Sequence, residues 1–337
     1  MPEAMDALIR DLSDRDRTVR REAEDNLVAL GAQSIDVLLP YVRDTRRGSP
    51  RFGAQSVLQR LGDQALPRLR QIRRRGPGQL RRKALEALVD LGGAEVLDDA
   101  DRRTVERLVR LKLLDESGVS LPLDGGRWLA FPADRFDEAV GALGLHDLRP
   151  ATSVMGVEAA TRATDSMEFQ DSRGAKQRAY RVFVTPEFEN WRQDLPIRNW
   201  RMVWGNSFVD ELDGFMLADK LSERCGEAHF YVLDPYHSGS SWYVARNGRR
   251  VRSCHNYDDC PQFWGEPLPF EADSIKDAAE GLEDEEYAKG VPHADVAADN
   301  LSVEPGPKSA DETHGHGWLA TTHPELPTVR FKGALPV

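Results

Sequence analysis

The sequence predicts an N-terminal all-α solenoid followed by an α+β domain with a largely antiparallel sheet. The solenoid is predicted by a phrase that occurs three times in the first 92 residues and closes each time on a glycine, at Gly31, Gly62 and Gly92. These glycines are 31 and 30 residues apart, a period typical of stacked helical repeats. The sheet is predicted by runs of alternating apolar residues and by Asn247-Gly248, the strongest short hairpin signal.

Each copy of the phrase has the period of an α-helix. One alanine and two leucines recur four and then three residues apart, as on one stripe of a helix. The small alanine suits the close approach of another helix, and each closing glycine suits the left-handed conformation that ends a helix. The recurring positions are Arg20, Arg51 and Arg81; Ala23, Ala54 and Ala84; Leu27, Leu58 and Leu88; Leu30, Leu61 and Leu91; and Gly31, Gly62 and Gly92.

A second helix is expected before each phrase, because Leu8, Leu39 and Leu69 stand at one common distance from the glycines. No helix pair can bury its apolar stripe alone, so neighbouring pairs must stack. The pattern resembles HEAT repeats, especially the short bacterial HEAT-like kind. That resemblance implies a surface for a partner. It also implies that the repeat arginine pairs with an acidic residue of a neighbouring turn, and Asp14 is the candidate in the first unit.

A further helix over residues 97–116 is expected to cap the open end of the solenoid and to complete a domain of residues 1–116. Acidic residues at its start and basic residues later suit the helix dipole. Its apolar stripe is Val105, Leu108, Leu111 and Leu114.

The pattern changes in residues 117–270, which we interpret as the α+β domain. Apolar alternation, turn residues and helix-ending glycines define its expected elements. They are strands at 128–132, 178–185, 200–208, 229–233, 241–246 and 249–255, helices at 134–145 and 215–224, and a polar loop at 158–176.

Residues 271–337 form an acidic segment, expected to be partly flexible. Glu283-Asp284-Glu285-Glu286 is expected in a helix, and a terminal strand, from Trp318-Leu319-Ala320 or Val329-Arg330-Phe331, to return to the α+β domain. The C-terminal two-thirds resembles an uncharacterised actinobacterial type of protein, through motifs such as Trp-x-Ala-x-Pro at 128–132 and Val-Thr-Pro at 184–186. The resemblance implies no activity.

Charge and cysteine content limit the class of partner and the cell compartment that we expect. Residues 1–115 carry a net charge of +4 and the remainder −15, which argues against nucleic-acid binding by the acidic part. No apolar run approaches the roughly 20 residues that span a bilayer, and the N-terminus lacks the apolar stretch of a secretory signal. The sparse cysteines, Cys225, Cys254 and Cys260, favour reduced thiols and a cytoplasmic protein.

No catalytic residue, metal site or cofactor is predicted. Cys254, His255 and Cys260 lack a Cys-x-x-Cys pair, and neighbouring strand residues point to opposite faces. His237-Ser238-Gly239-Ser240-Ser241 lacks the Gly-x-Ser-x-Gly frame and is interpreted as a polar loop, as is His314-Gly315-His316. Phosphate-binding glycine motifs are absent from the sequence. An enzyme whose site is formed by distant residues stays open, and a pocket lined by His237, Cys254, Asp234 or Asp258 would favour it.

The strongest functional feature is a basic edge. Stacking places equivalent turns along one edge of a solenoid, and the turns between the paired helices carry Arg15, Arg17, Arg46, Arg47, Arg73, Arg74 and Arg75. These arginines could also serve only solubility. We expect a non-enzymatic interaction protein, an adaptor, scaffold or immunity-type binder, that docks a protein partner, with acidic proteins among the candidates. The first alternative is nucleic-acid binding by this edge, because some DNA glycosylases resemble HEAT solenoids; the second is an enzyme in the α+β domain.

Overall fold

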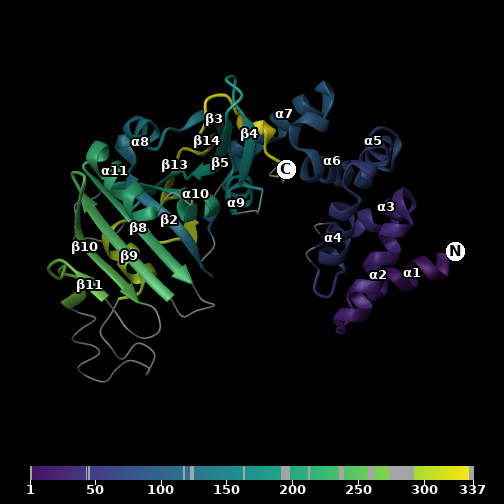
Figure 1. Cartoon of the computed structure of the whole chain (residues 1–337), viewed down its shortest axis with the longest axis horizontal. Helices are drawn as coiled ribbons and strands as arrows, with labels where there is room; N and C mark the ends of the chain where they lie inside the picture. Colours follow the sequence, from purple (N-terminus) through teal and green to yellow (C-terminus); the bar gives the residue numbers. More distant parts are fainter. Residues whose placement is uncertain are drawn as a thin grey trace. The chain divides into compact units, whose positions relative to one another are not determined.

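The computed structural model describes residues 2–42, 44, 46–116, 118–121, 125–161, 164–190, 198–211, 213–234, 239–256, 262–272 and 292–333. Two compact units divide the chain, Met1–Arg107 with Lys332–Val337, and Leu108–Phe331. The first unit is helical and the second is α+β with an antiparallel sheet (Figure 1). The predicted order, helices first and the α+β part after them, is confirmed. The division falls inside a helix, after Arg107, where the sequence placed it after residue 116.

The three copies of the phrase form three helices, α2, α4 and α6, each preceded by a shorter helical element. The preceding element of the middle copy is short because Pro40 follows closely, so α3 gives way to a 3-10 turn at Leu39–Tyr41. The helices of this unit are α1 (Pro2–Asp11), α2 (Arg17–Ala29), α3 (Ile35–Leu38), α4 (Arg51–Leu61), α5 (Leu66–Arg75), α6 (Gly78–Gly92) and α7 (Asp99–Asp115).

Most of the repeat stripe is buried. The three alanines are at most 2% exposed and Leu27, Leu58 and Leu88 at most 3%. Leu30 departs from the stripe, since 38% of its surface is exposed. The α7 stripe is also wrong in part: Val105 is buried, but Leu111 and Leu114 are exposed.

The closing glycines behave as expected in two copies. Gly31 and Gly62 have φ of +60° and +52°, the left-handed region that glycine tolerates. In the third copy this role falls to Gly93, with φ of +64°, while Gly92 has φ of −137°. Gly92 lies so close to Val96 that a Cβ would be 2.1 Å from a methyl carbon, so its small size serves packing.

The second unit is built around one antiparallel sheet. Its main path runs β11-β10-β9-β8-β2-β7-β5-β14-β3, and every neighbouring pair of described strands is antiparallel. These strands are β2 (Gly126–Pro132), β3 (His146–Ala151), β5 (Lys176–Val184), β7 (Asn199–Trp204), β8 (Glu227–Asp234), β9 (Gly239–Arg246), β10 (Arg249–Asn256), β11 (Gln262–Trp264) and β14 (Gly317–Thr321). Short strands add the pairs β1 (Gly118–Ser120) with β12 (Pro307–Ser309) and β6 (Glu187–Glu189) with β13 (Thr313–His314).

Both faces of the sheet are covered. Helices α8 (Phe136–Leu143) and α11 (Gly214–Cys225) pack on the face that carries Leu129, Phe131 and Phe230. The opposite face carries stacked aromatic rings, including Trp128 with its centroid 5.7 Å from that of Trp204. Helices α9 (Ser153–Thr161) and α13 (Ala294–Leu301) contact strands β5 and β8, respectively.

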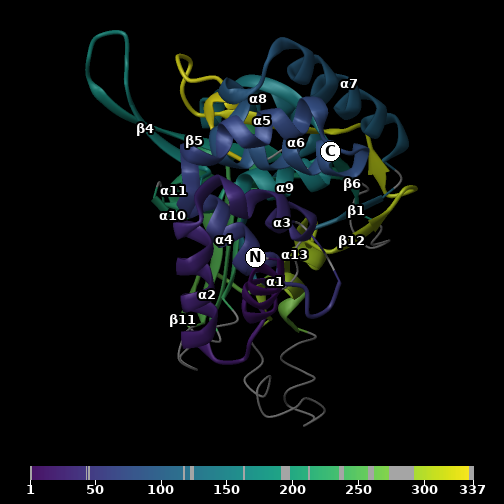
Figure 2. The same ribbon diagram turned by 90° about the vertical axis from the view of Figure 1, so that its right-hand side faces the viewer.

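Several sequence expectations need correction. Residues 158–176 are not one loop: they contain the end of α9 and strand β4 (Ser166–Gln170), which pairs with β5 in a hairpin that reaches out from the sheet (Figure 2). The strand expected at 200–208 ends at Trp204, and α10 (Asn206–Glu211) follows. At the C-terminal end, β14 lies between β5 and β3, but Val329–Arg330 belong to a 3-10 turn. The expected acidic helix at 283–286 lies outside the described residues.

The predicted β9–β10 hairpin is present. Asn247 and Gly248 have φ of +50° and +76°, the positive values that a two-residue hairpin turn requires. Similarly, α8 and α11 end at Leu143 and Cys225, within two residues of the expected ends, and the glycine that follows each has a positive φ, +64° at Gly144 and +82° at Gly226.

Candidate functional site

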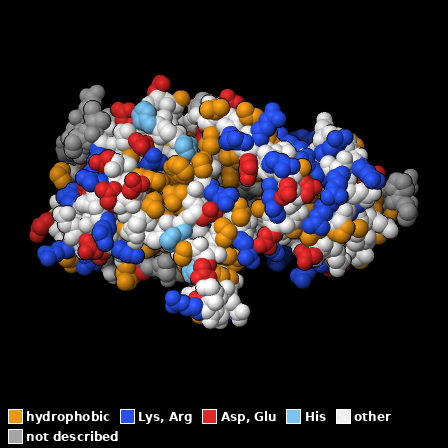
Figure 3. Space-filling view, turned by 90° about the horizontal axis from the view of Figure 1, so that it is seen from above, with side chains coloured by type: hydrophobic (Ala, Val, Ile, Leu, Met, Phe, Trp, Pro, Cys, Tyr) orange, Lys and Arg blue, Asp and Glu red, His pale blue; other side chains and the backbone are white. Residues whose placement is uncertain are grey.

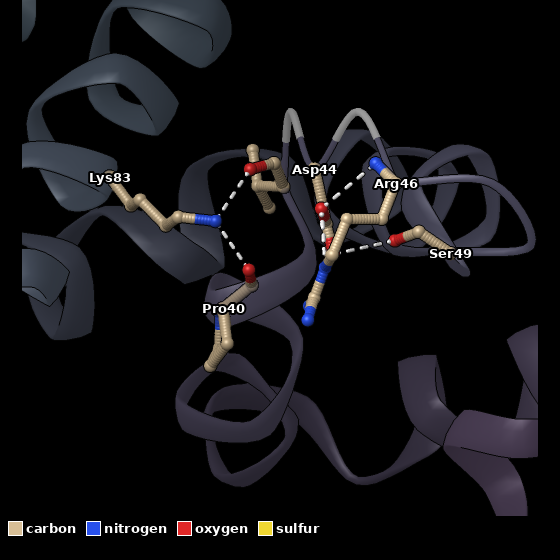
Figure 4. A network of polar contacts seen from close by, with 6 residues as sticks. Pro40, Asp44, Arg46, Ser49 and Lys83 are labelled. Atoms are coloured by element: carbon tan, nitrogen blue, oxygen red, sulfur yellow. Dashed lines mark hydrogen bonds and ion pairs between the residues drawn. The ribbon is translucent and has the colours of Figure 1, made fainter.

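Three of the seven turn arginines are held in ion pairs within the helical unit. Arg73 Nε lies 2.6 Å from an Asp101 carboxylate oxygen. Arg74 lies 3.4 Å from Asp98. Arg46 forms a close pair with Asp44 at 2.7 Å, and hydrogen bonds from Arg46 lower the pKa of the Asp44 carboxyl well below its usual range (Figure 4). These three charges are therefore largely offset where they stand.

The other four, Arg15, Arg17, Arg47 and Arg75, are exposed. Within the described part of the chain, none of the four forms an ion pair. Figure 3 shows basic side chains gathered over the helical unit, with acidic side chains among them. Of the seven turn arginines, four thus carry a positive charge without an ion-pair partner in the described residues, which is fewer than the sequence suggests.

The repeat arginines have a structural role. Arg20 donates to the carbonyls of Asp14 and Arg15, at 2.7 and 2.9 Å, and Arg81 donates to the Gly76 carbonyl at 2.6 Å. The Arg20 side chain therefore contacts the backbone carbonyl of Asp14 and not its carboxylate, which accepts a hydrogen bond from the Asp16 amide. In the first and third units, the arginine ties the turn between the paired helices to the second helix.

The middle unit uses its arginine differently. The Arg51 guanidinium lies over the Phe52 ring, 4.4 Å from its centroid. Phe52 is 70% exposed, so this copy shows an aromatic ring and a cation together at its surface.

Successive units contact one another in the same way. Gly53 and Lys83 both stand nine residues before the closing glycine of their unit. A Cβ at Gly53 would lie 2.9 Å from Leu12 Cδ2, at the end of α1. Lys83 Nζ donates to the carbonyls of Pro40 and Val42, at the equivalent end of the next unit (Figure 4). In the middle and third units, the second helix thus starts against the end of the preceding unit's first helical element.

Polar contacts also join helices of successive units, both between the second helices and between the first. Ser56 donates to Glu24 at 2.8 Å, and Arg60 pairs with Asp25 at 2.6 Å, so α4 is joined to α2. Arg68 of α5 donates to Asp36 of α3.

The α+β unit carries a pocket of about 380 Å³ over one end of its sheet. A single row of residues across four adjacent strands forms its floor: Arg127 on β2, Val232 on β8, Ser241 on β9 and His255 on β10. The register pairs each of these residues with the next, so their side chains share one face.

The end of α10 and the start of α11 form the rest of the pocket, and Phe230 of β8 completes the floor. The lining residues are Val209, Asp210, Asp213, Gly214, Phe215 and Phe230. Gly214 packs so tightly that a Cβ would lie 2.2 Å from Phe230 Cζ. Asp213 has φ of +62°, an unusual value for a non-glycine residue, and its carboxylate accepts from the Phe215 amide at 3.0 Å to cap α11.

The floor brings two chemically reactive groups together. Ser241 Oγ lies 2.7 Å from His255 Nδ1, a short hydrogen-bond distance. Ser241 is 1% exposed, whereas His255 is exposed. Ser241 belongs to strand β9, as the strand expected at 241–246 requires, but β9 begins two residues earlier, at Gly239, so the interpretation of 239–241 as part of a polar loop is wrong.

A β-bulge creates this pair. From the turn, Arg246 pairs with Arg249 and Ala245 with Arg250, but Val244 pairs with Arg252, so Val251 is an extra residue. If the same residues paired without a bulge, Ser241 would face Cys254 instead of His255. Bulges occur next to functional sites, where they re-aim side chains. The turn motif was visible in the sequence, but nothing in the sequence signalled the bulge.

The other residues that the sequence singled out do not gather at this pocket. Cys254 is buried on the opposite face, and burial raises the pKa of its thiol to about 12. Asp234, at the end of β8, is not among the lining residues. His237, Asp258 and Cys260 lie outside the described residues.

His314 and His316, expected in a loop, lie elsewhere in this unit, and His314 belongs to strand β13, where it pairs with Glu187 of β6. His314 lies 3.7 Å from a Glu189 carboxylate oxygen, and burial, followed by the Arg201 charge, lowers the pKa of His316. Among the residues with described positions, no cluster of three His, Cys, Asp or Glu side chains could hold a metal ion.

No family model, curated protein or solved structure matches the chain. In the described part of the chain, every helix is too short or too polar to cross a bilayer.

Proposed function

We propose that the N-terminal helical unit is a HEAT-like solenoid and that this cytoplasmic protein works as an adaptor or scaffold that docks a protein partner with an acidic surface. One observation carries the proposal: the position nine residues before the closing glycine contacts the preceding turn in both later units. A repeated contact of this kind supports stacking with one geometry, and stacked units offer an extended surface. Docking itself requires no catalytic residue.

We propose that the four arginines without ion pairs contact the partner. Arg15, Arg17, Arg47 and Arg75 stand in or beside equivalent turns, so stacking sets them along one edge. Exposed charges of this kind act mainly by steering a partner of opposite charge and by setting its orientation. Phe52 adds an apolar anchor on the middle unit, because a ring that is 70% exposed has surface to bury.

An acidic protein is favoured over nucleic acid by the charge balance. The first 115 residues carry only +4, and three of the seven edge arginines are offset by Asp44, Asp98 and Asp101. A nucleic-acid backbone is bound by neutralising several phosphates at once, which needs a denser basic surface.

Charge reversal tests the proposal. One variant of the full chain changes Arg15, Arg17, Arg47 and Arg75 to glutamate. The matched control changes four exposed arginines elsewhere, and both variants alter the net charge equally. The control positions are Arg103, Arg173, Arg224 and Arg249. Crosslinking in the source cell and quantitative mass spectrometry should then compare the captured proteins.

We expect one set of acidic proteins to be captured by the wild type and the control but lost from the edge variant. Identical profiles for all three chains would contradict the proposal. In parallel, fluorescence anisotropy with a DNA duplex over a salt series tests the alternative. A steep fall of affinity with salt, absent in the edge variant, would show that the edge binds a nucleic-acid backbone instead.

A further inference from the structure

We propose that the pocket of the α+β unit hydrolyses a small carboxylic ester, with Ser241 as the nucleophile and His255 as its general base. The proposal goes beyond the docking function and does not depend on it, because every residue of the pocket belongs to the second unit.

The geometry of the pair suits nucleophilic catalysis. A serine hydroxyl is a weak nucleophile until a base accepts its proton, and the base must lie within hydrogen-bond distance. The 2.7 Å separation of Ser241 Oγ and His255 Nδ1 meets that requirement in the free protein. Both residues are held on paired strands, so the pair is positioned by the sheet and not by a loop.

The pocket defines the substrate class. A volume of about 380 Å³ is at the low end of small-molecule sites. Val209, Phe215, Phe230 and Val232 supply apolar walls that suit a hydrocarbon acyl or alcohol group. An ester fits better than an amide, since an alcohol is a stronger acid than an amine and so leaves more readily from the tetrahedral intermediate.

Arg127 is placed to stabilise the charge that develops. It lies on the same row as Ser241, two strands away, and pairs with Asp210 at the rim. A guanidinium carries five N–H donors, so Asp210 leaves others for an oxyanion. The positive φ of Asp213 adds a second sign of function, since strained backbone is concentrated at active sites.

The reaction needs no reactant other than water. His255 accepts the Ser241 proton as Oγ bonds to the carbonyl carbon, and the carbonyl electron pair becomes an oxyanion near Arg127. The bond to the alkoxy oxygen then breaks, and His255 donates the proton to the leaving alcohol. Water repeats the sequence on the acyl-serine, which releases the carboxylic acid and restores the hydroxyl.

The experiment treats the purified full chain with a fluorophosphonate, which forms a covalent bond only with an activated serine, and locates the adduct by peptide mass spectrometry. Hydrolysis of p-nitrophenyl butyrate is measured on the same samples. The variants are Ser241→Ala and His255→Gln. The matched control is Ser253→Ala, which removes a serine two residues from His255 on the same strand and face. Circular dichroism checks the fold of each variant.

We expect the adduct on Ser241, with both labelling and hydrolysis lost in Ser241→Ala and unchanged in Ser253→Ala. Loss of a general base typically costs 10²–10⁴-fold, so His255→Gln should slow both reactions by about 100-fold or more. Because His255 is exposed, this variant keeps the test valid even if Ser241→Ala fails to fold. No adduct on Ser241 in the wild type, or equal labelling of His255→Gln, would overturn the proposal.

Discussion

Two leucines of the first repeat, Leu27 and Leu30, should respond very differently to truncation. Both belong to the stripe that the repeat defines, and Leu→Ala removes the same atoms from each. Leu27 is 0% exposed, whereas 38% of the Leu30 surface is exposed. Comparing Leu27→Ala with Leu30→Ala therefore measures how far the packing of this unit follows the repeat frame.

The burial of each leucine sets the expected magnitude. A buried Leu→Ala change costs about 2–5 kcal/mol of the free energy of unfolding, from lost transfer energy and the remaining cavity, so we expect about 3 kcal/mol for Leu27→Ala. Leu30 loses only part of the transfer energy and leaves no enclosed cavity, so we expect about 1 kcal/mol. With a urea m-value of about 2 kcal/mol/M, the unfolding midpoints should fall by about 1.5 M and about 0.5 M.

Urea unfolding followed by far-UV circular dichroism measures both midpoints. All seven tryptophans follow residue 127, so tryptophan fluorescence reports on the α+β unit and serves as an internal reference. Equal shifts of the circular dichroism midpoint for the two variants, or a larger shift for Leu30→Ala, would refute the reasoning from burial.

Two further predictions concern the α+β unit. Gly156→Ala should destabilise it by about 3 kcal/mol or more, because the new Cβ would lie 2.0 Å from the buried Phe183 ring. Gly141→Ala, where a Cβ meets no atom within 4 Å, should be neutral or stabilise the unit by up to about 1 kcal/mol. Thermal unfolding measures both variants, and similar melting temperatures would contradict this prediction. Burial raises the pKa of Glu227, but contacts with His229 and Arg246 outweigh it and lower the pKa to about 2. The carboxylate therefore contributes stability above the ordinary pKa of 4.5 that is lost as the pH falls toward 2. Glu227→Gln should thus be less stable than the wild type at neutral pH, by at most about 3 kcal/mol, and a gap that does not shrink in acid would contradict this.

The helices of the repeat could be predicted because their burial follows the sequence period. Ala54 and Leu58 are buried four residues apart, as a stripe on α4 requires. Periodicity could not show which glycine of the Gly92-Gly93 pair would take the left-handed conformation, because either residue can adopt a positive φ.

Strand β4 shows a signal that was present but weak. Met167 and Phe169 alternate with polar residues over five residues, which is the strand period. The strand has few buried side chains of its own, and its two apolar residues pack against Ala179, Leu326 and Phe331. Since two of these contacts come from distant residues, the local sequence alone favours a polar loop.

The pocket could be predicted only in part. The Asn247-Gly248 turn fixes how β9 and β10 begin to pair, and simple counting from that turn sets Ser241 opposite Cys254. The extra residue at Val251 depends on packing: a Cβ at Gly265 would lie 2.2 Å from the Val251 carbonyl oxygen, so a glycine from a later segment accommodates the bulge. Such a contact cannot be inferred from the hairpin sequence.

A one-residue bulge also determines how this strand can change by insertion and deletion. Removal of Val251 would abolish the bulge and leave the later pairs unchanged, because Arg252 already pairs with Val244 and His255 with Ser241. If Val251 instead took a regular place in the ladder opposite Val244, Cys254 would enter the pocket row and His255 would pass to the face of Trp242. Loss of the Val251 codon therefore keeps the imidazole in the pocket row, whereas a one-residue shift of pairing that absorbs the bulge exchanges it for a thiol without any substitution. In this hairpin the register of the pairing, as much as the identity of the residues, decides which chemistry the pocket contains.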